Sequence, residues 1–353
     1  MGVFLRILVG VAVAGGLWFL YLYDAAGQFR KLEPLSAGVC RAVTGAAGAE
    51  DIALDRGAAT ALVSSDPRTG DRGALYAYSL DPGAGDRLVD LTADLPGELR
   101  PHGISLLARE SGGGTLFVVN HTTSGDAVDV FAWQPNEAGG TLEPLRSVRD
   151  PLLVSVNDVA AVDDVRFYAT NDHGSASRRR QALDDYLRLS RANVVYWDGS
   201  SARVVASRIA YANGIALSQN GEELYVAATT KGEILVYDRD LESGDLELRK
   251  AIATGTGVDN LTVDMHGDLW IGAHPHLFSF LRHAGDPSRR SPSEVVWVDP
   301  DGLAEPPVRP VWRSLGEDLS GSSVAVPFGS RILIGSVFEP HFLVCDRNAT
   351  RSG

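Results

Sequence analysis

Val258-Asp259-Asn260-Leu261-Thr262-Val263-Asp264 is the stretch of sequence that decides the fold. Its apolar alternation predicts a short β-strand with two oxygen-bearing side chains at its start. Similar stretches recur along the chain, each followed by a second strand rich in aromatic and β-branched residues. At spacings of 46 to 63 residues, the first apolar residues of the six copies are Ile52, Ile104, Val159, Ile215, Leu261 and Val324. Six such units predict an all-β fold, a six-bladed β-propeller with about one blade per unit.

The polar residues at the start of these copies are expected to converge. The first strand of each propeller blade lies innermost, so the starts of these strands meet at one mouth of a central tunnel. Asn and Asp at a strand start are also ordinary turn residues. Acid and amide pairs at equivalent positions of three copies favour a shared site over that explanation. The converging residues are Glu50, Asp51, His102, Asn157, Asp158, Asn213, Asp259 and Asn260.

Length and charge limit the class of protein. A chain of 353 residues has room for two average domains, but one closed all-β repeat can use all of it. The formal net charge of −13 argues against a nucleic-acid-binding surface and suits a protein that holds cations.

The N-terminus predicts a membrane-associated segment. Residues 7–23 carry no charge, and Trp18, Tyr21 and Tyr23 lie near the far end, where interfacial aromatic residues are common. The run favours an uncleaved signal-anchor over a cleaved signal peptide, and both place the remainder outside the cytoplasm, on the periplasmic or secreted side. We therefore expect an anchor helix over 1–24, a connector over 25–39, the propeller over 40–346 and a tail over 347–353.

Two further features bear on the architecture. Cys40 and Cys345 lie near the two ends of the repeat region, either as unrelated buried thiols or as a disulfide joining the first strand to the last. A disulfide would require an oxidising compartment. Residues 177–191 (SRRRQALDDYLRLSR) interrupt the β pattern with helical spacing. This insertion is either an ordinary surface helix or a lid over the tunnel mouth.

The converging oxygens suit calcium. Ca²⁺ accepts six to eight oxygen ligands in irregular geometry, whereas Zn²⁺ prefers His and Cys. Two carboxylates would balance the charge of one divalent ion, and three neutral amides would add further oxygen ligands. A second set of donors could hold a second ion. The first set is Glu50, Asn157, Asn213, Asp259 and Asn260. The second set is Asp51, Asp158 and the backbone carbonyl of Ile104. Because alternate strand residues point to different sides, adjacent residues could serve different ions.

Two histidines complete a possible hydrolytic site. His102 begins one inner strand and His121 ends the strand expected to pair with it. One imidazole could take a proton from water while the other orients it, and Ca²⁺ could stabilise the oxyanion of an ester or lactone. No Gly-x-Ser-x-Gly nucleophile motif is present, which disfavours a serine hydrolase.

These motifs resemble the paraoxonase/arylesterase family. The matching segments, in order, are Pro101–Ser105, Val119–His121, Asn157–Val159, Phe167–His173, Asn213–Ile215, Val258–Asn260 and Gly272–Pro275. The resemblance implies a six-bladed propeller with two calcium ions, a disulfide between its terminal segments and hydrolysis of lactones and aryl esters. It also implies the two ligand sets given above and a His102–His121 dyad. It further implies that Tyr211 and His274 lie in the wall of the substrate pocket.

Two departures and two alternative functions remain. The segment Ser64–Arg68 introduces charge where pocket wall is expected, and the helical insertion is more basic than the family pattern. Both features bear on substrate preference. One alternative is a gluconolactonase-like sugar lactonase, against which the second carboxylate set and the two histidines argue. The other is a non-catalytic extracytoplasmic scaffold with structural calcium.

Overall fold

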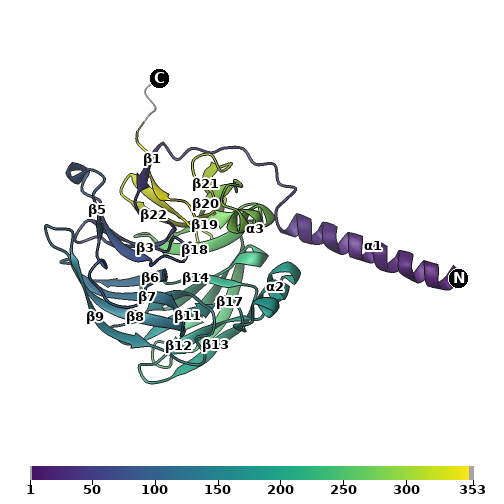
Figure 1. The fold of residues 1–353 in the computed structure, drawn as a ribbon, viewed down its shortest axis with the longest axis horizontal. Helices are drawn as coiled ribbons and strands as arrows, with labels where there is room; N and C mark the ends of the chain where they lie inside the picture. Colours follow the sequence, from purple (N-terminus) through teal and green to yellow (C-terminus); the bar gives the residue numbers. More distant parts are fainter. Residues whose placement is uncertain (1, 350–353) are drawn as a thin grey trace.

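Six four-stranded antiparallel sheets arranged around an axis form the body of the protein (Figure 1). The structure is a computed structural model, and it describes residues 2–349. The innermost strand of each blade contacts the innermost strands of both neighbouring blades, which closes the ring. The sequence-based prediction of a six-bladed β-propeller is therefore confirmed. The last four residues of the expected tail, 350–353, lie outside the described residues.

The strands follow the chain from the inside of each blade outward in the first three blades. The first blade contains β2 (Ala49–Asp55), β3 (Thr60–Ser65), β4 (Ala74–Ser79) and β5 (Leu88–Asp90). The second contains β6 (Pro101–Ala108), β7 (Gly114–Thr122), β8 (Gly125–Gln134) and β9 (Thr141–Val148). The third contains β10 (Val156–Ala161), β11 (Phe167–Asn171), β12 (Ala192–Trp197) and β13 (Ala202–Ile209).

The next two blades repeat this order, and the sixth differs in its outer strand. The fourth contains β14 (Ala212–Leu217), β15 (Glu223–Ala228), β16 (Glu233–Arg239) and β17 (Leu246–Ala253). The fifth contains β18 (Gly257–Val263), β19 (Leu269–His274), β20 (Ser293–Val298) and β21 (Val308–Ser314). The sixth contains β22 (Ser322–Phe328), β23 (Arg331–Ser336), β24 (His341–Asp346) and β1 (Val39–Thr44).

The two ends of the propeller are joined within the sixth blade. Strand β1 pairs antiparallel with β24, and Cys40 lies opposite Cys345 in that register. The two cysteines form a disulfide across a sequence separation of 305 residues. Of the two possibilities left open by the sequence, the disulfide is confirmed. A crosslink that closes so long a loop removes conformational entropy from the unfolded chain.

Each innermost strand carries the same irregularity. In β2 the pairing passes from Ala49↔Ser65 to Ile52↔Val63, so that Glu50 and Asp51 together face one residue of β3. The equivalent shifts in the other innermost strands fall at 102–103, 157–158, 213–214, 259–260 and 323–324. A β-bulge of this kind leaves an extra residue out of the ladder and redirects its side chain. We expected regular strand alternation to point adjacent polar residues, such as Glu50 and Asp51, in different directions. That expectation is wrong, because a β-bulge separates them instead.

The bulges also correct the register of the sixth copy. The structure places Ala325 opposite Ile334, in the position that Ile52 and Leu261 occupy in their blades. The sequence analysis had taken Val324 as the equivalent residue. Ser322, Ser323 and Val324 have no charged side chain to mark the bulge, so the pattern alone is ambiguous by one residue there.

Apolar residues fill the space between neighbouring blades. One such cluster joins the first and sixth blades through Val63, Val326 and Phe342, all fully buried. Comparable clusters lie between the other pairs of neighbouring blades. Burial of side chains of this size contributes about 1.5–3 kcal/mol each relative to an exposed position. The packed blades hold the innermost strands, and therefore the bulges, in fixed positions.

Three α-helices lie outside the sheets of the described chain. Helix α1 (Gly2–Ala25) projects away from the propeller (Figure 1), and its apolar side chains are largely exposed. Residues 3–25 are long and apolar enough to cross a membrane, with a mean hydropathy of 2.2, although a signal sequence meets the same criteria. Helix α2 (Arg178–Leu187) is the predicted insertion. Helix α3 (Leu277–Gly285) was not predicted.

The end of α1 is attached to the propeller through α3. The backbone N–H of Leu277 donates to the carbonyl of Ala26 at 3.0 Å, and the rings of Tyr23 and Phe278 are 6.0 Å apart. Arg30 donates to the carbonyl of Gly255 at 3.0 Å. These contacts fix the start of the connector against the fifth blade.

Candidate functional site

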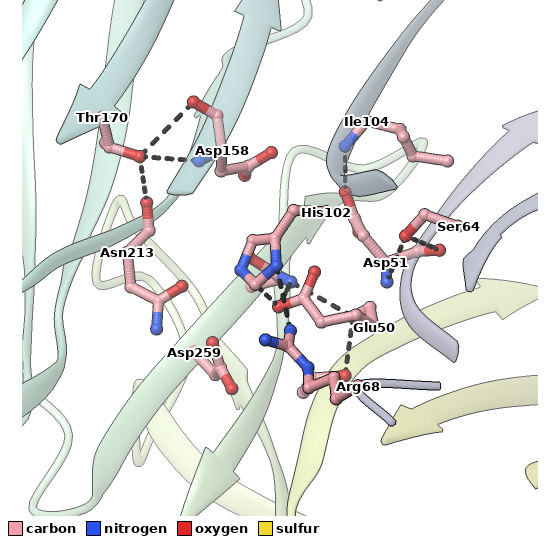
Figure 2. A network of polar contacts seen from close by, with 12 residues as sticks. Glu50, Asp51, Ser64, Arg68, His102, Ile104, Asp158, Thr170, Asn213 and Asp259 are labelled. Carbon is pink, nitrogen blue, oxygen red and sulfur yellow. Dashed lines mark hydrogen bonds and ion pairs between the residues drawn. The ribbon is translucent and has the colours of Figure 1, made fainter. Parts of the chain in front are cut away.

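The predicted site residues meet at one end of the propeller tunnel. They line a cavity of about 330 Å³, together with residues of α2, α3 and the end of α1. Figure 2 shows Glu50, His102, Asn213 and Asp259 entering this region from different blades. The predicted residues that line the cavity are Glu50, His102, His121, Asn157, Tyr211, Asn213, Asp259 and His274. Asn260, Asp51, Ile104 and Asp158 are buried but do not line the cavity.

The first predicted ligand set consists of buried oxygens with unused hydrogen-bonding capacity. All five residues are at most 4% exposed. In four of them, one side-chain oxygen is buried with no hydrogen-bond partner: Glu50 Oε2, Asn157 Oδ1, Asn213 Oδ1 and Asn260 Oδ1. Buried polar atoms are normally paired, so four unpaired oxygens in one region call for a missing partner. A hard cation that prefers oxygen ligands fits this donor set.

The charge on this set points to the same partner. Asn260 donates from Nδ2 to Glu50 Oε1 at 2.9 Å, which positions one carboxylate oxygen and leaves the other without a partner. Burial, followed by repulsion from Asp259, raises the pKa of Glu50 well above its ordinary value. A cation beside these two carboxylates would remove that repulsion and favour their ionised forms.

The second predicted set lies deeper and is better satisfied by backbone groups. The carboxylate of Asp51 accepts from the N–H groups of Ile52 at 2.8 Å and Ile104 at 2.7 Å. Asp158 accepts from Val159 at 2.7 Å and from Ile215 at 2.8 Å. Each carboxylate therefore links two neighbouring blades.

These two carboxylates are also close enough to repel each other. Burial raises the pKa of Asp51 to about 7, and burial followed by repulsion from Asp51 raises that of Asp158. The hydrogen bonds from backbone N–H groups offset only part of this effect. Two buried carboxylates with spare lone pairs can accept a cation, but this set lacks the unpaired oxygens that mark the first one.

The two histidines have different surroundings. Their ring centroids are 5.0 Å apart. Arg68 Nη2 lies 3.0 Å from His102 Nδ1, and His102 Nε2 lies 3.4 Å from Glu50 Oε1. Because a guanidinium can only donate, Nδ1 of His102 accepts and its proton lies on Nε2, toward Glu50. Neither nitrogen of His102 is thus left as a proton acceptor, since Nδ1 is occupied by Arg68 and Nε2 carries the proton.

His121 keeps one nitrogen available. Its Nδ1 lies 2.8 Å from Asp126 Oδ1, and the other carboxylate oxygen of Asp126 accepts from the N–H of Val156 at 2.8 Å. A carboxylate at Nδ1 favours the tautomer that carries its proton there and leaves Nε2 as an acceptor. Sequence analysis did not identify Asp126, because it lies outside the innermost strands.

Tyr211 and His274 lie in the cavity wall with further contacts. His274 Nε2 is 2.8 Å from Asp259 Oδ2, and its ring stacks on Phe280 of α3 at 3.7 Å. The contact between His274 and Asp259 can orient the Asp259 carboxylate as a metal ligand. Tyr211 has a φ of +59° and places its ring 5.1 Å from that of His173.

The first donor set contains more amides than carboxylates. Within residues 2–349, no group of three or more His, Cys, Asp or Glu side chains is arranged to hold a metal ion. The first donor set avoids that pattern because three of its five members are amides. The contribution of α3 was also missed, although its apolar residues Leu277, Phe280, Leu281 and Ala284 follow a helical repeat.

A histidine joins helix α2 to the propeller at the cavity mouth. His173 places Nδ1 2.7 Å from Asp172 and Nε2 3.0 Å from Asp185 of α2. Burial lowers the pKa of His173, but the hydrogen bonds to Asp172 and Asp185 outweigh it and raise the pKa to about 10. An imidazolium between two carboxylates therefore holds α2 at neutral pH.

Comparisons with known proteins agree on a family. The family model described as Arylesterase matches residues 87–347. Serum paraoxonase/arylesterase 2 of Rattus norvegicus is 34% identical over 350 residues, covering 94% of this chain and 95% of the relative. A gluconolactonase from Xanthomonas campestris has a TM-score of 0.55 at 16% identity, with 90% and 95% of the two chains covered. A calcium-binding protein, regucalcin, from Agrobacterium tumefaciens has a TM-score of 0.54 at 15% identity, with 89% and 95% covered. At these identities the two structures show the fold alone.

The contact through His173 predicts pH-dependent attachment of α2. The pKa of His173 is raised from 6.5 to about 10 in the folded protein. The stabilisation that its ion pairs give to the attachment of α2 is therefore complete below about pH 6.5, and it is lost as pH rises through about 10. His173→Asn should make tryptic cleavage at residues 178–180 several-fold faster at pH 7.5. Near pH 10, the cleavage rate of the wild-type protein should approach that of the variant. To correct for the pH dependence of trypsin, each rate is divided by the cleavage rate of a free peptide of the same sequence. His266→Asn, at an exposed histidine, is the matched control, and equal rates for both variants would contradict the assignment.

Proposed function

The chain belongs to the arylesterase family, and we propose that it is a calcium-dependent hydrolase of lactones and aryl esters. Family membership supports ester or lactone hydrolysis. The observation that carries the calcium assignment is the group of four buried, unpaired oxygens on Glu50, Asn157, Asn213 and Asn260. Together with Asp259, these residues would hold the catalytic ion. Asp51, Asp158 and the carbonyl of Ile104 would hold a second, structural ion.

The chain's own residues would perform the proton transfer. Bound calcium supplies polarisation of the substrate carbonyl and stabilisation of negative charge on its oxygen. His121 accepts a proton from water at Nε2 while Asp126 holds the proton on Nδ1. The water oxygen bonds to the acyl carbon, the ester C–O bond breaks, and the proton returns to the leaving oxygen. A lactone then gives a hydroxy acid, and an aryl ester gives an acid and a phenol.

His102 would take the positioning role in this dyad. Its Nδ1 accepts from Arg68, and its Nε2 therefore carries the proton. Neither nitrogen can then take a proton from water, so His121 is the better base. His274 would orient Asp259, and Tyr211 would form part of the pocket wall.

We also propose that α1 is an uncleaved signal-anchor and that the propeller lies on the periplasmic or secreted side. The apolar helix and the disulfide are compatible with an extracytoplasmic location. Leu22 of α1 and Ala26, which directly follows the helix, contribute to the cavity lining. This contact supports retention of the helix, because cleavage would remove part of the wall.

Calcium removal tests the proposed function. The full-length protein in detergent should hydrolyse a medium-chain lactone and phenyl acetate in calcium. It should lose both activities and melt at a lower temperature in chelator, and it should regain both when calcium is restored. Stabilisation by calcium without turnover of either substrate would favour a non-catalytic scaffold. If calcium changed neither rate nor melting temperature, the metal assignment would be wrong.

Substitutions of the dyad test the assignment of the base. His121→Gln should lower kcat by about 10²- to 10⁴-fold, the usual contribution of a general base. Asp126→Asn should lower kcat by less, because the imidazole remains but its orientation is lost. Neither change should remove calcium-dependent stabilisation, since neither residue is a proposed ligand. A larger loss of kcat in His102→Gln than in His121→Gln, with calcium binding retained in both, would assign the base to His102 instead.

A further inference from the structure

The positive charge of Arg68 is the feature of the cavity that the proposed mechanism leaves unexplained, although one of its donors orients His102. The other basic side chains at the mouth have clear partners. His173 lies between Asp172 and Asp185, and Arg188 donates from Nε to the carbonyl of Thr230 at 2.6 Å. Within the described part of the chain, Arg68 forms no ion pair with a carboxylate.

The loop between β3 and β4 holds Arg68 in an unusual backbone conformation. Its φ is +54°, in the left-handed region that non-glycine residues rarely adopt. The carboxylate of Asp66 accepts from the N–H of Arg68 at 2.9 Å, which stabilises this turn. Residues held in such conformations cluster at functional sites. This loop places the side chain of Arg68 in the cavity lining.

Two contacts orient the guanidinium. One nitrogen lies 3.0 Å from His102 Nδ1, and its central carbon lies 5.6 Å from the centroid of the Phe338 ring. Figure 2 shows the side chain reaching toward His102 and Glu50. Only one of the five N–H donors is accounted for by the His102 contact. Because Arg68 lines the cavity, its other N–H groups can donate to a ligand bound there.

The charge of the site favours an anionic ligand for these donors. A divalent cation would balance the charges of Glu50 and Asp259. The nearby carboxylate of Asp66 bonds to the backbone N–H of Arg68, and no carboxylate within residues 2–349 forms an ion pair with the guanidinium. A planar guanidinium binds a carboxylate through two parallel hydrogen bonds, and Phe338 limits its movement. The His102 ring contacts both groups: its Nδ1 lies 3.0 Å from Arg68 Nη2, and its Nε2 lies 3.4 Å from Glu50 Oε1. A carboxylate on Arg68 would therefore lie a few bonds from a carbonyl at the metal site.

From this geometry we propose that Arg68 forms an anion subsite, which selects esters and lactones that carry a second, carboxylate group near the reacting carbonyl. This inference rests on the proposed hydrolase function for the identity of the reacting group. The subsite itself is a property of Arg68, the cavity and the adjacent aromatic ring.

Two matched esters test the subsite in the full-length protein with calcium. The monophenyl ester of glutaric acid carries a carboxylate where phenyl pentanoate has a methyl group, and both release phenol. The wild-type protein should prefer the glutarate ester in kcat/KM by about tenfold or more, the effect of one additional charge-assisted contact. In Arg68→Gln, which keeps a donor for His102 without the charge, this ratio should fall toward one. Arg68→Lys should keep part of it.

Binding of glutarate separates the subsite from the hydrolase function. Calorimetry on the calcium-loaded protein should show that Arg68→Gln weakens glutarate binding about tenfold or more relative to wild type and more than Arg68→Lys does. If wild type hydrolyses neither ester but shows this Arg68-dependent binding, the subsite stands and the hydrolase proposal fails. An equal loss of rate on both esters in Arg68→Gln leaves their ratio unchanged and overturns the subsite. Glutarate binding that does not depend on Arg68 overturns it as well.

Discussion

The site depends on a β-bulge in each innermost strand of the propeller. At each bulge, two successive residues face one residue of the neighbouring strand, so their side chains leave the regular alternation. In β2 this frees Glu50 for the cavity, while Asp51 bonds to the backbone of the next blade. The same geometry in β10 separates Asn157 from Asp158. Because the bulges recur in strands that surround one axis, their oxygen donors form two layers around that axis.

Burial makes this arrangement costly without a cation. Glu50, Asp51 and Asp158 have raised pKa values, chiefly because the surrounding strands exclude water. Backbone N–H groups compensate the deeper layer, whereas the upper layer retains unpaired oxygens. A calcium ion would therefore join residues of separate blades and link the stability of the propeller to the chemistry at its mouth. The arginine, histidines and apolar helices line that mouth and would set which substrates reach the ion.

The repeat made most of the fold predictable. Regular spacing of strand pairs indicated six blades, and equivalent polar pairs such as Asn157-Asp158 and Asp259-Asn260 indicated one shared site. The disulfide followed from the need to join the terminal strands, although the sequence left free thiols possible. The bulges were not predicted, because two adjacent polar residues at a strand start look alike in a regular and an irregular ladder. Asp126 was missed because its role depends on packing between β8 and the neighbouring blade, and α3 because its nine residues interrupt a strand pattern only briefly.

Calcium held by the converging oxygens would be counted by equilibrium dialysis of the purified full-length protein, as bound ions per chain. We expect two ions in the wild-type protein. We expect one in Asn213→Ala, which removes a ligand of the upper layer only. If the wild-type protein keeps its fold and binds no calcium, the oxygens do not form a calcium site.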